Sequence, residues 1–320
     1  DDFAVLAAGF RCGLKVGGSC TRLYPLGTRR IQLCRVSRQW MDPEAEATMT
    51  TAVESEQPFS TESHCPICAS PARFVASDSW WRDSFTCSGC GSIPRERALM
   101  LTIDRWLPHW REAVIHESSP CNRSASYRLA TECPGYIGTQ FFADRPGDRV
   151  VDGIRNENLE QLSFADGSID LHVTQDVFEH VLNPDAAFRE IGRTLSPGGM
   201  HVFTVPLVNK HRPSVTRARF LEGEIRHLLP PEYHGNPVGD GRALVVTDWG
   251  YDICARIHRA SGLFTHALHI DDLHHGIRAE YIEILVTVKP AACGRQDRFA
   301  AGRHPASPHG LRPRLSNPPL

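Results

Sequence analysis

Residues 158–206 read NLEQLSFADGSIDLHVTQDVFEHVLNPDAAFREIGRTLSPGGMHVFTVP, and this stretch decides the fold. Within it, residues 168–174 are mostly apolar and rich in β-branched side chains, which predicts a strand buried on both faces. Apolar residues at helical spacing follow Asn183, and the Pro-Gly-Gly turn at 197–199 precedes a second apolar strand at 201–206. A strand–helix–strand unit of this kind is right-handed and belongs to a parallel sheet. We therefore predict an α/β fold with a doubly wound, mostly parallel sheet that binds ligands at the carboxyl ends of its strands.

The same stretch contains short motifs that are similar to those of one enzyme family. They begin at Asn158, continue as Ala-Asp-Gly-Ser-Ile-Asp at 165–170 and Asp-Val-Phe-Glu-His-Val at 176–181, and close with the Pro-Gly-Gly turn. In this order they resemble the type 11 branch of the class I S-adenosylmethionine-dependent methyltransferases, most specifically over residues 112–206. The resemblance implies a Rossmann-like, seven-stranded sheet with an antiparallel edge, S-adenosylmethionine as the cofactor, and methyltransferase activity.

The resemblance also implies where the methionine part of the cofactor binds. In the family a Gly-x-Gly loop follows the first strand, which we expect at residues 113–116. Here Glu117, Ser118, Ser119 and Pro120 follow instead, and serine lacks the freedom of glycine at positive φ. The resemblance implies that Glu117 holds the cofactor's ammonium group, directly or through water, and that Ser118 and Pro120 line the loop. An exposed loop glutamate is the alternative interpretation of Glu117.

The adenosine part is assigned to the following strand ends, again by resemblance. The side-chain carbonyl of Asn158 would accept a hydrogen bond from the adenine amino group, and the backbone amide of Leu159 would meet a ring nitrogen. Gln175 and Asp176 would lie at the rim of the crevice, unless they only cap a helix or form a turn. Three residues near the end of the second strand are candidates for the ribose hydroxyls: Thr139, Gln140 and Asp144.

Four cysteines form a pattern typical of a zinc ribbon. Cys65 and Cys68 make one Cys-x-x-Cys pair, and Cys87 and Cys90 make a second. Four thiolates complete the tetrahedral coordination of Zn²⁺ and leave no position open for catalysis, so we predict a structural zinc site. Disulfides are a weaker interpretation, because no secretory segment is evident. Between the pairs, Trp80 and Trp81 either pack the ribbon or face a substrate.

The patterns divide the chain into several parts. Met41 and Met49 are candidate native starts, because the residues before them do not resemble a clean signal peptide. We predict a flexible leader at 1–63, part of it not native, a zinc-ribbon-like module at 64–92, a connecting helix at 93–111, a methyltransferase domain at 112–290 with a lid insert at 207–242, and a disordered tail at 291–320.

The lid insert and one neighbouring motif supply the candidate catalytic residues. Tyr233 and His234 are placed to orient or deprotonate an acceptor hydroxyl, or alternatively to anchor the loop by hydrogen bonds. His180 follows Glu179 at the crevice and is a further candidate base, although such a pair is often architectural in the resembling family.

Charge and composition indicate which classes of binding partner and which cellular compartment to expect. The first 40 residues have a net charge of +5, and the residues from Gly294 onward have a net charge of +4. Because the whole chain has a net charge of −2, the middle part, residues 41–293, has a net charge of −11. An acidic middle is a poor phosphate binder, which disfavours a nucleic-acid partner. The longest apolar run of the leader is too short to span a membrane. The eleven cysteines suit a reducing compartment, so we expect a cytoplasmic protein. No pattern indicates an oligomeric state.

These observations support three functional hypotheses. The leading one is methyl transfer from S-adenosylmethionine to a small-molecule or glycan-type acceptor. The second is a non-catalytic zinc-ribbon adaptor on a methyltransferase-like fold, which the missing Gly-x-Gly favours. The third is an RNA methyltransferase, which the ribbon favours and the acidic middle disfavours.

Overall fold

The computed structural model describes residues 59–142, 149–151, 153–235 and 241–291, and the backbone of 23–26 and 29–32. The chain separates into two units, Asp1–Gln57 and Pro58–Leu320. In the first unit the described residues form a hairpin of β1 (Leu23–Leu26) and β2 (Arg29–Gln32). The rest of the leader before residue 59, and the tail from residue 292, lie outside the described residues, and with them the predictions of a flexible leader and a disordered tail.

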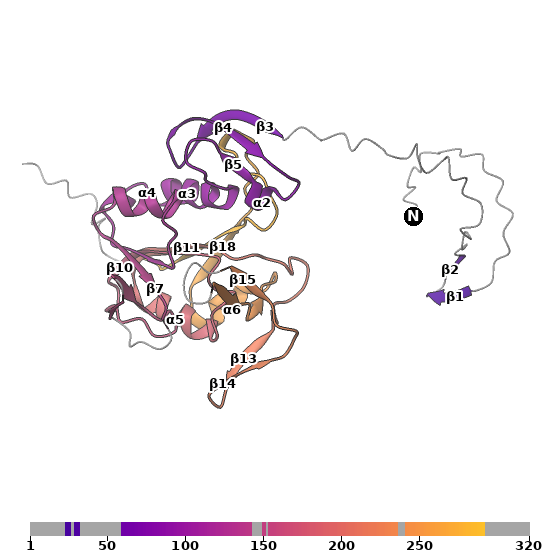
Figure 1. Ribbon diagram of the computed structural model, residues 1–320. Helices are drawn as coiled ribbons and strands as arrows, with labels where there is room; N and C mark the ends of the chain where they lie inside the picture. The colour runs from indigo at the N-terminus through magenta and orange to yellow at the C-terminus, as the bar shows by residue number, and fades with distance from the viewer. Residues whose placement is uncertain are drawn as a thin grey trace, which may run out of the picture. The chain divides into compact units, whose positions relative to one another are not determined.

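An eight-stranded sheet forms the centre of the second unit (Figure 1). Its strand order is β18-β19-β11-β10-β6-β7-β9-β8, and the pairs from β11 to β9 are parallel. The β11–β19 and β18–β19 pairs at one edge and the β8–β9 pair at the other edge are antiparallel. The predicted doubly wound, mostly parallel sheet with an antiparallel edge is confirmed, and the short β8 makes eight strands rather than seven. The bounds are β6 (Ile115–Ser118), β7 (Tyr136–Gln140), β8 (Val150–Val151), β9 (Ile154–Asn156), β10 (Ile169–Gln175), β11 (Leu195–Thr204), β18 (Phe264–Leu268) and β19 (Ile284–Val288).

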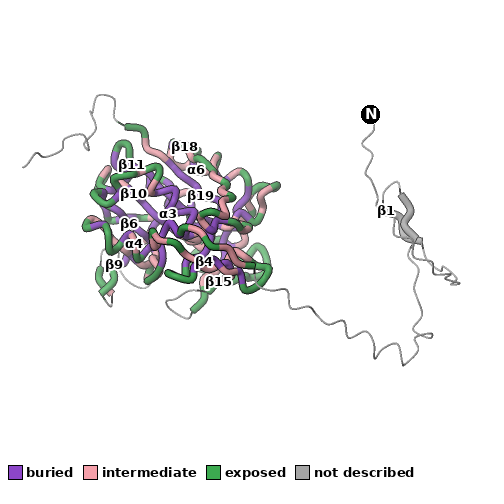
Figure 2. Tube along the Cα trace, turned by 90° about the horizontal axis from the view of Figure 1, so that it is seen from above, coloured by how far each residue is buried: buried purple, intermediate pink, exposed green. Residues whose placement is uncertain are grey.

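Helices cover both faces of this sheet (Figure 1). On one face lie α3 (Pro94–Trp106) and α4 (Ser124–Glu132), and on the other α5 (Pro184–Thr194) and α6 (Ile253–Ser261). The predicted start of α5 is confirmed, because the Asn183 side chain accepts a hydrogen bond from the Ala186 amide at 3.2 Å. The strands between the layers are buried (purple in Figure 2), and each face has its own hydrophobic core. No helix among the described residues is long and apolar enough to cross a membrane.

Three buried histidines lie side by side on the central strands. His116, His172 and His201 come from β6, β10 and β11, and each is 0% exposed. Nδ1 of His116 lies 2.8 Å from Nδ1 of His172, and neutral rings satisfy this contact because one nitrogen donates and the other accepts. Burial lowers the pKa of His116 and of His201 to about 3, and it lowers that of His172 well below its ordinary value. The sheet therefore requires these rings to be uncharged.

The cysteine pairs lie in a small antiparallel ribbon before α3. The ribbon consists of β3 (Ser60–Cys65), β4 (Ser70–Ala76) and β5 (Phe85–Cys87), with the short α2 (Trp81–Ser84) before β5. Arg97 of α3 is fully buried and donates hydrogen bonds to the carbonyls of Phe85, Ser92 and Gly276. One guanidinium thus joins the ribbon, α3 and the loop before β19.

The predicted helix after the ribbon is shorter than expected. α3 ends at Trp106, and a separate turn, η2 (Trp110–Glu112), follows. Pro108 lies between them and has no amide hydrogen for a continuing helix, which accounts for the break.

The insert after β11 folds into short paired strands rather than an irregular loop. Two hairpins, β13–β14 and β15–β16, follow one another, and β12 pairs with β17. The β13–β14 hairpin projects from the body of the unit (Figure 1). We call this region, residues 207–248, the lid segment. The bounds are β12 (Val215–Thr216), β13 (Ala218–Leu221), β14 (Glu224–His227), β15 (Tyr233–Gly235), β16 (Arg242–Leu244) and β17 (Thr247–Asp248).

Candidate functional site

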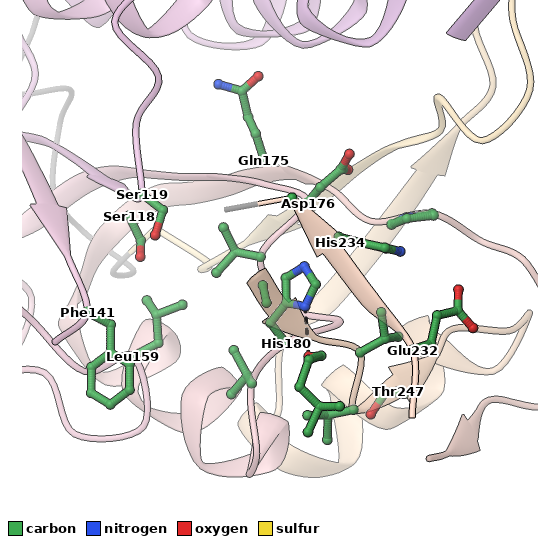
Figure 3. A pocket seen from close by; sticks show the side chains of 18 of the residues that line it. Ser118, Ser119, Phe141, Leu159, Gln175, Asp176, His180, Glu232, His234 and Thr247 are labelled. Atoms are coloured by element: carbon green, nitrogen blue, oxygen red, sulfur yellow. Dashed lines mark hydrogen bonds between the residues drawn. The ribbon is translucent and has the colours of Figure 1, made fainter. Parts of the chain in front are cut away.

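A cavity of about 990 Å³ opens at the carboxyl ends of β6, β7 and β10. The lid segment and the α2 turn of the ribbon also contribute walls, so three parts of the unit meet at one space (Figure 3). Most of the predicted cofactor and catalytic residues line it: Ser118, Pro120, Asn158, Leu159, Gln175, Asp176, His180 and His234. Glu117 and Tyr233 are not among the lining residues.

Glu117 lies beneath the cavity and is bound by other side chains. It is 1% exposed. Oε1 accepts hydrogen bonds from Ser126 Oγ at 2.7 Å and Gln175 Nε2 at 2.9 Å, and Oε2 accepts one from the Tyr136 hydroxyl at 2.8 Å. Burial raises the pKa of Glu117, although these three donors oppose the shift. The carboxylate is thus held inside the protein, and Ser118, the next residue of the same strand, faces the cavity instead.

The loop after β6 adopts the conformation for which the family uses glycine. Ser119 has a φ of 57°, in the left-handed region that is unfavourable for residues with a Cβ atom. Its amide donates to the Thr139 carbonyl at 2.7 Å, which holds the turn. Gly138 of β7 lies below the loop, where an added Cβ would come within 3.2 Å of Pro120 Cγ. Ser119 therefore adopts at this turn a backbone conformation that glycine adopts more readily.

Gln175 lines the cavity and has one unpaired acceptor atom. Its Nε2 donates to Glu117 and, at 3.1 Å, to Ser126 Oγ, which fixes the orientation of the amide. Its Oε1 is buried and finds no donor among the described residues. A buried amide oxygen without a donor is unfavourable, so this atom indicates where a ligand with an N–H or O–H group would bind.

Asp176 is neutralised by two arginines from outside the sheet. Arg82 of α2 donates to its Oδ2, Arg95 Nε lies 3.3 Å from the same oxygen, and Thr204 Oγ1 donates to Oδ1 at 2.9 Å. Burial opposes ionisation, but Arg95 and Arg82 outweigh it and hold the pKa of Asp176 below its ordinary value. Its φ of 51° is a second strained position at the cavity. Asp176 therefore attaches the ribbon to the rim of the sheet.

Only some of the residues predicted to bind the adenosine part of the cofactor line the cavity. Asn158 and Leu159 line the cavity, and the side-chain oxygen of Asn158 accepts a hydrogen bond from the Glu160 amide at 2.9 Å, with a lone pair remaining. Of the three ribose candidates, Gln140 lines the cavity. Thr139 is buried and bonded to His116 Nε2 at 2.8 Å, and Asp144 lies outside the described residues.

The lid end of the cavity is the part that the lid segment lines, and strand alternation there separates Tyr233 from His234. Tyr233 and His234 are successive residues of β15, so their side chains point to opposite faces. His234 lines the cavity beside His180 (Figure 3), whereas the Tyr233 ring lies outside, with the Arg242 guanidinium 3.9 Å from its centre. Nδ1 of His180 donates to the Leu244 carbonyl at 2.9 Å, and burial lowers the pKa of His180.

The two tryptophans between the cysteine pairs do different things. Trp81 packs inside the ribbon, with its ring centre 4.6 Å from that of Phe59 and 5.0 Å from that of Phe85. Trp80 lines the cavity near Tyr281, at 6.1 Å between ring centres. Packing of the ribbon is therefore confirmed for Trp81, whereas Trp80 lies at the cavity and its contact with a substrate stays a prediction.

The four ribbon cysteines converge on one point. Their sulfurs all lie within 4.8 Å of one another, with Cys65 3.7 Å from Cys90 and Cys68 3.9 Å from Cys87. Two sulfurs bound to one zinc at about 2.3 Å lie roughly 3.8 Å apart, whereas a disulfide requires about 2.05 Å. A hydrogen bond from Cys65 lowers the pKa of Cys90 to about 4. Gly91 turns the chain after the second pair with a φ of 67°. The donor set and spacing fit zinc.

Comparison with known proteins relates part of the central sheet to one family. Residues 142–203 match the family model Methyltransf_11, a methyltransferase domain. The predicted resemblance to the type 11 methyltransferases is confirmed. The matched segment contains β9, β10 and α5 and most of β11, and it supports assigning the chain to this class of enzymes. No curated protein sequence matches the chain.

Several solved structures are similar at low identity. An S-adenosylmethionine-dependent methyltransferase from Mesorhizobium loti is 17% identical, with a TM-score of 0.40, over 60% of this chain and 97% of that one. A 1,6-didemethyltoxoflavin-N1-methyltransferase from Burkholderia thailandensis, with S-adenosylhomocysteine bound, is 14% identical, with a TM-score of 0.37, over 61% and 78%. A methyltransferase from Methanosarcina mazei is 15% identical, with a TM-score of 0.35, over 59% and 97%.

Sequence reasoning did not single out two charged side chains at the site, Arg82 and Glu179. Arg82 was hidden in an aromatic stretch, and its partner Asp176 lies 94 residues away, so no local pattern connects them. Glu179 was noted only as the neighbour of His180, because its burial without a hydrogen-bond donor cannot be read from the sequence.

Proposed function

We propose that this protein transfers a methyl group from S-adenosylmethionine to a small-molecule or short glycan-type acceptor bound in the cavity. The observation that carries the proposal is a cavity at the carboxyl ends of β6, β7 and β10 whose buried amide oxygen, on Gln175, has no donor among the described residues. A volume of about 990 Å³ is at the upper end of the usual range for ligand sites, which suits a nucleoside together with a small second molecule.

The residues of the sheet end fit the cofactor. The unpaired Oε1 of Gln175 would accept from the ammonium group, a role that the sequence suggested for Glu117. The Ser118–Pro120 turn would run beside the methionine part, and Asn158, Leu159 and Gln140 would contact the nucleoside. When bound, S-adenosylmethionine supplies a methyl group already activated by its sulfonium charge.

The lid end would hold the acceptor. The protein's main task is to place the acceptor atom in line and to exclude water, which the lid segment and Trp80 serve by covering the cavity. His180 is fixed by its hydrogen bond to Leu244, and its other nitrogen, like the imidazole of His234, is available to an acceptor hydroxyl. A cavity walled by the lid segment favours a small acceptor over a polymer.

The four-cysteine cluster would bind one structural Zn²⁺. Four thiolates leave no coordination position open, so the ion would hold the ribbon, and through Arg82 one wall of the cavity, in place. Metal analysis of the purified chain should find one zinc equivalent that is absent from Cys65→Ser.

Calorimetric titration of the zinc-loaded full chain with S-adenosylmethionine tests the proposal. We expect binding at one site, and we expect Gln175→Leu to weaken it roughly 10- to 100-fold, because a charge-assisted hydrogen bond is worth about 1.5–3 kcal/mol. Gln161→Leu, at an exposed position, is the matched control and should bind like the wild type. Absence of binding by folded, zinc-loaded protein would contradict the proposal and favour the adaptor hypothesis.

A further inference from the structure

Three metal-ligating side chains meet at the lid end of the cavity, apart from the cysteine cluster. Glu179 follows β10, His180 is the next residue, and His234 comes from β15 of the lid segment. Oε1 of Glu179 lies 3.8 Å from Nε2 of His180 and 3.8 Å from Nδ1 of His234. The three ligand atoms all lie within 4.8 Å of one another. Both histidines line the cavity (Figure 3).

The carboxylate of Glu179 accepts no hydrogen bond within the part of the chain that the structure describes. Glu179 is 2% exposed, and neither of its oxygens accepts a hydrogen bond from any described residue. The two arginines nearby are bound to Asp176 instead. A buried carboxylate without partners is strongly unfavourable, so either it is protonated or a cation binds to it.

The orientation of His180 favours the cation. A carbonyl oxygen only accepts, so the Leu244 carbonyl fixes the proton of His180 on Nδ1. The nitrogen with the free lone pair is therefore Nε2, which is the atom that faces Glu179. Metal-binding histidines commonly donate their second nitrogen to a backbone carbonyl in this way, because the bond fixes the tautomer.

The spacing also suits one ion. Two ligands that each lie about 2.1 Å from a metal can be up to roughly 4.2 Å apart, and both 3.8 Å separations satisfy this limit. Two imidazoles and one carboxylate are a ligand set for divalent transition metals such as Zn²⁺ and Co²⁺, whereas Mg²⁺ and Ca²⁺ prefer oxygen ligands. His234 is partly exposed on a hairpin and can turn toward the ion.

We propose that Glu179, His180 and His234 bind one divalent transition-metal ion at the lid end of the cavity. Three protein ligands leave coordination positions that open toward the cavity, where an oxygen-bearing acceptor would bind. In that case the two histidines act as ligands rather than as free bases. The site is defined by its own geometry and does not depend on methyl transfer.

Cobalt binding to the full chain tests this proposal. The chain is first loaded with one equivalent of Zn²⁺, which four thiolates hold in preference to other sites. Titration with Co²⁺ should then show one further equivalent bound, with visible d–d absorption and no thiolate charge-transfer band. Both Glu179→Gln and His234→Ala should weaken this binding by more than about 10-fold, the lower limit for loss of even an outer-shell partner.

Two controls keep the test specific. Glu232→Gln removes another carboxylate from the cavity wall, and His227→Ala removes an exposed histidine from β14, so both should bind Co²⁺ like the wild type. His234→Ala changes only a hairpin side chain and keeps the test valid if Glu179→Gln does not fold. The proposal is overturned if the zinc-loaded wild type binds no Co²⁺, or if His234→Ala binds it equally well. Titration with S-adenosylmethionine is a separate measurement, so either proposal can fail alone.

Discussion

The two ends of the cavity treat a buried glutamate in opposite ways. At the sheet end, Glu117 is 1% exposed and accepts hydrogen bonds from Ser126, Tyr136 and Gln175. At the lid end, Glu179 is 2% exposed and finds no donor among the described residues. Burial raises the pKa of both carboxyl groups, but only the first is opposed by side-chain donors.

From this difference we infer that Glu117 has a structural role and that Glu179 binds a ligand. Equal burial makes the two glutamates look alike, and only the count of their donors distinguishes them. The donors of Glu117 come from β7, α4 and the end of β10, so its carboxylate connects neighbouring elements of the sheet. Glu179 makes no such connection, which is why we assign it to a metal site.

Replacing each glutamate by leucine should give the largest difference in the free energy of unfolding between the two positions. Glu117→Leu removes the acceptor of three hydrogen bonds, and of the three donors Gln175 Nε2 keeps a second acceptor in Ser126 Oγ, so we expect the free energy of unfolding to fall by about 2–4 kcal/mol. Glu179→Leu removes an unpaired carboxylate, so with only the ribbon zinc present we expect a change within about 1 kcal/mol, or a gain. Urea unfolding monitored by circular dichroism measures both. Equal losses would mean that Glu179 has partners that the structure does not reveal.

Stability in acid tests the effect of burial on a second set of groups, because burial keeps the three histidines of the sheet neutral. The pKa of His116 and of His201 is about 3 in the folded protein, against about 6.5 in the unfolded chain. The unfolded chain therefore binds more protons below pH 6.5. The stabilisation is complete above that pH and is lost as the pH falls, by about 1 kcal/mol per pH unit for each histidine.

Urea unfolding between pH 7.5 and 5.5 checks this expectation. His201→Gln keeps a group that can bond to Thr174 but does not titrate, so its stability should depend less steeply on pH than that of the wild type. His227→Gln, at an exposed position, should leave the slope unchanged. Identical slopes for all three proteins would contradict the assignment.

The smallest expected effect concerns the turn beside Glu117. Ser119→Gly removes a Cβ atom from a residue with a φ of 57°, so we expect stabilisation by up to about 1 kcal/mol. Ser118→Gly, one residue earlier in β6, is the matched control and should destabilise by about 0.5–1 kcal/mol, because glycine loses more conformational freedom in a strand. Thermal unfolding of both variants measures the difference, and a shift of the same sign in both would argue against strain at Ser119.

Local patterns predicted much of the sheet and one of its helices. The strands near 168–174 and 201–206 and the cap at Asn183 follow from residue types within a few positions of one another, so sequence alone was sufficient. The resemblance directed attention to the residues that line the cavity, including Gln175, Asp176 and His180.

Contacts between residues far apart in the chain could not be predicted from the sequence. The donors to Glu117 come from residues 9 to 58 positions away, and the sequence does not reveal that they would occupy its carboxylate. Tyr233 and His234 point to opposite faces of β15, which could not be foreseen because no strand was predicted at these residues. The ion pair between Arg82 and Asp176 joins two modules that were interpreted separately.

That ion pair has a consequence for regulation. Because Arg82 lies between the two cysteine pairs and contacts the wall of the nucleoside cavity, anything that stabilises the ribbon also preorganises that wall. Thermodynamic reciprocity then requires that a ligand in the cavity strengthen the binding of the proposed zinc ion by the same factor as the ion strengthens the binding of that ligand. If the cysteine cluster binds zinc as we propose, scarcity of the metal would lower the affinity of the cavity for its ligand, although none of the four cysteines lines the cavity.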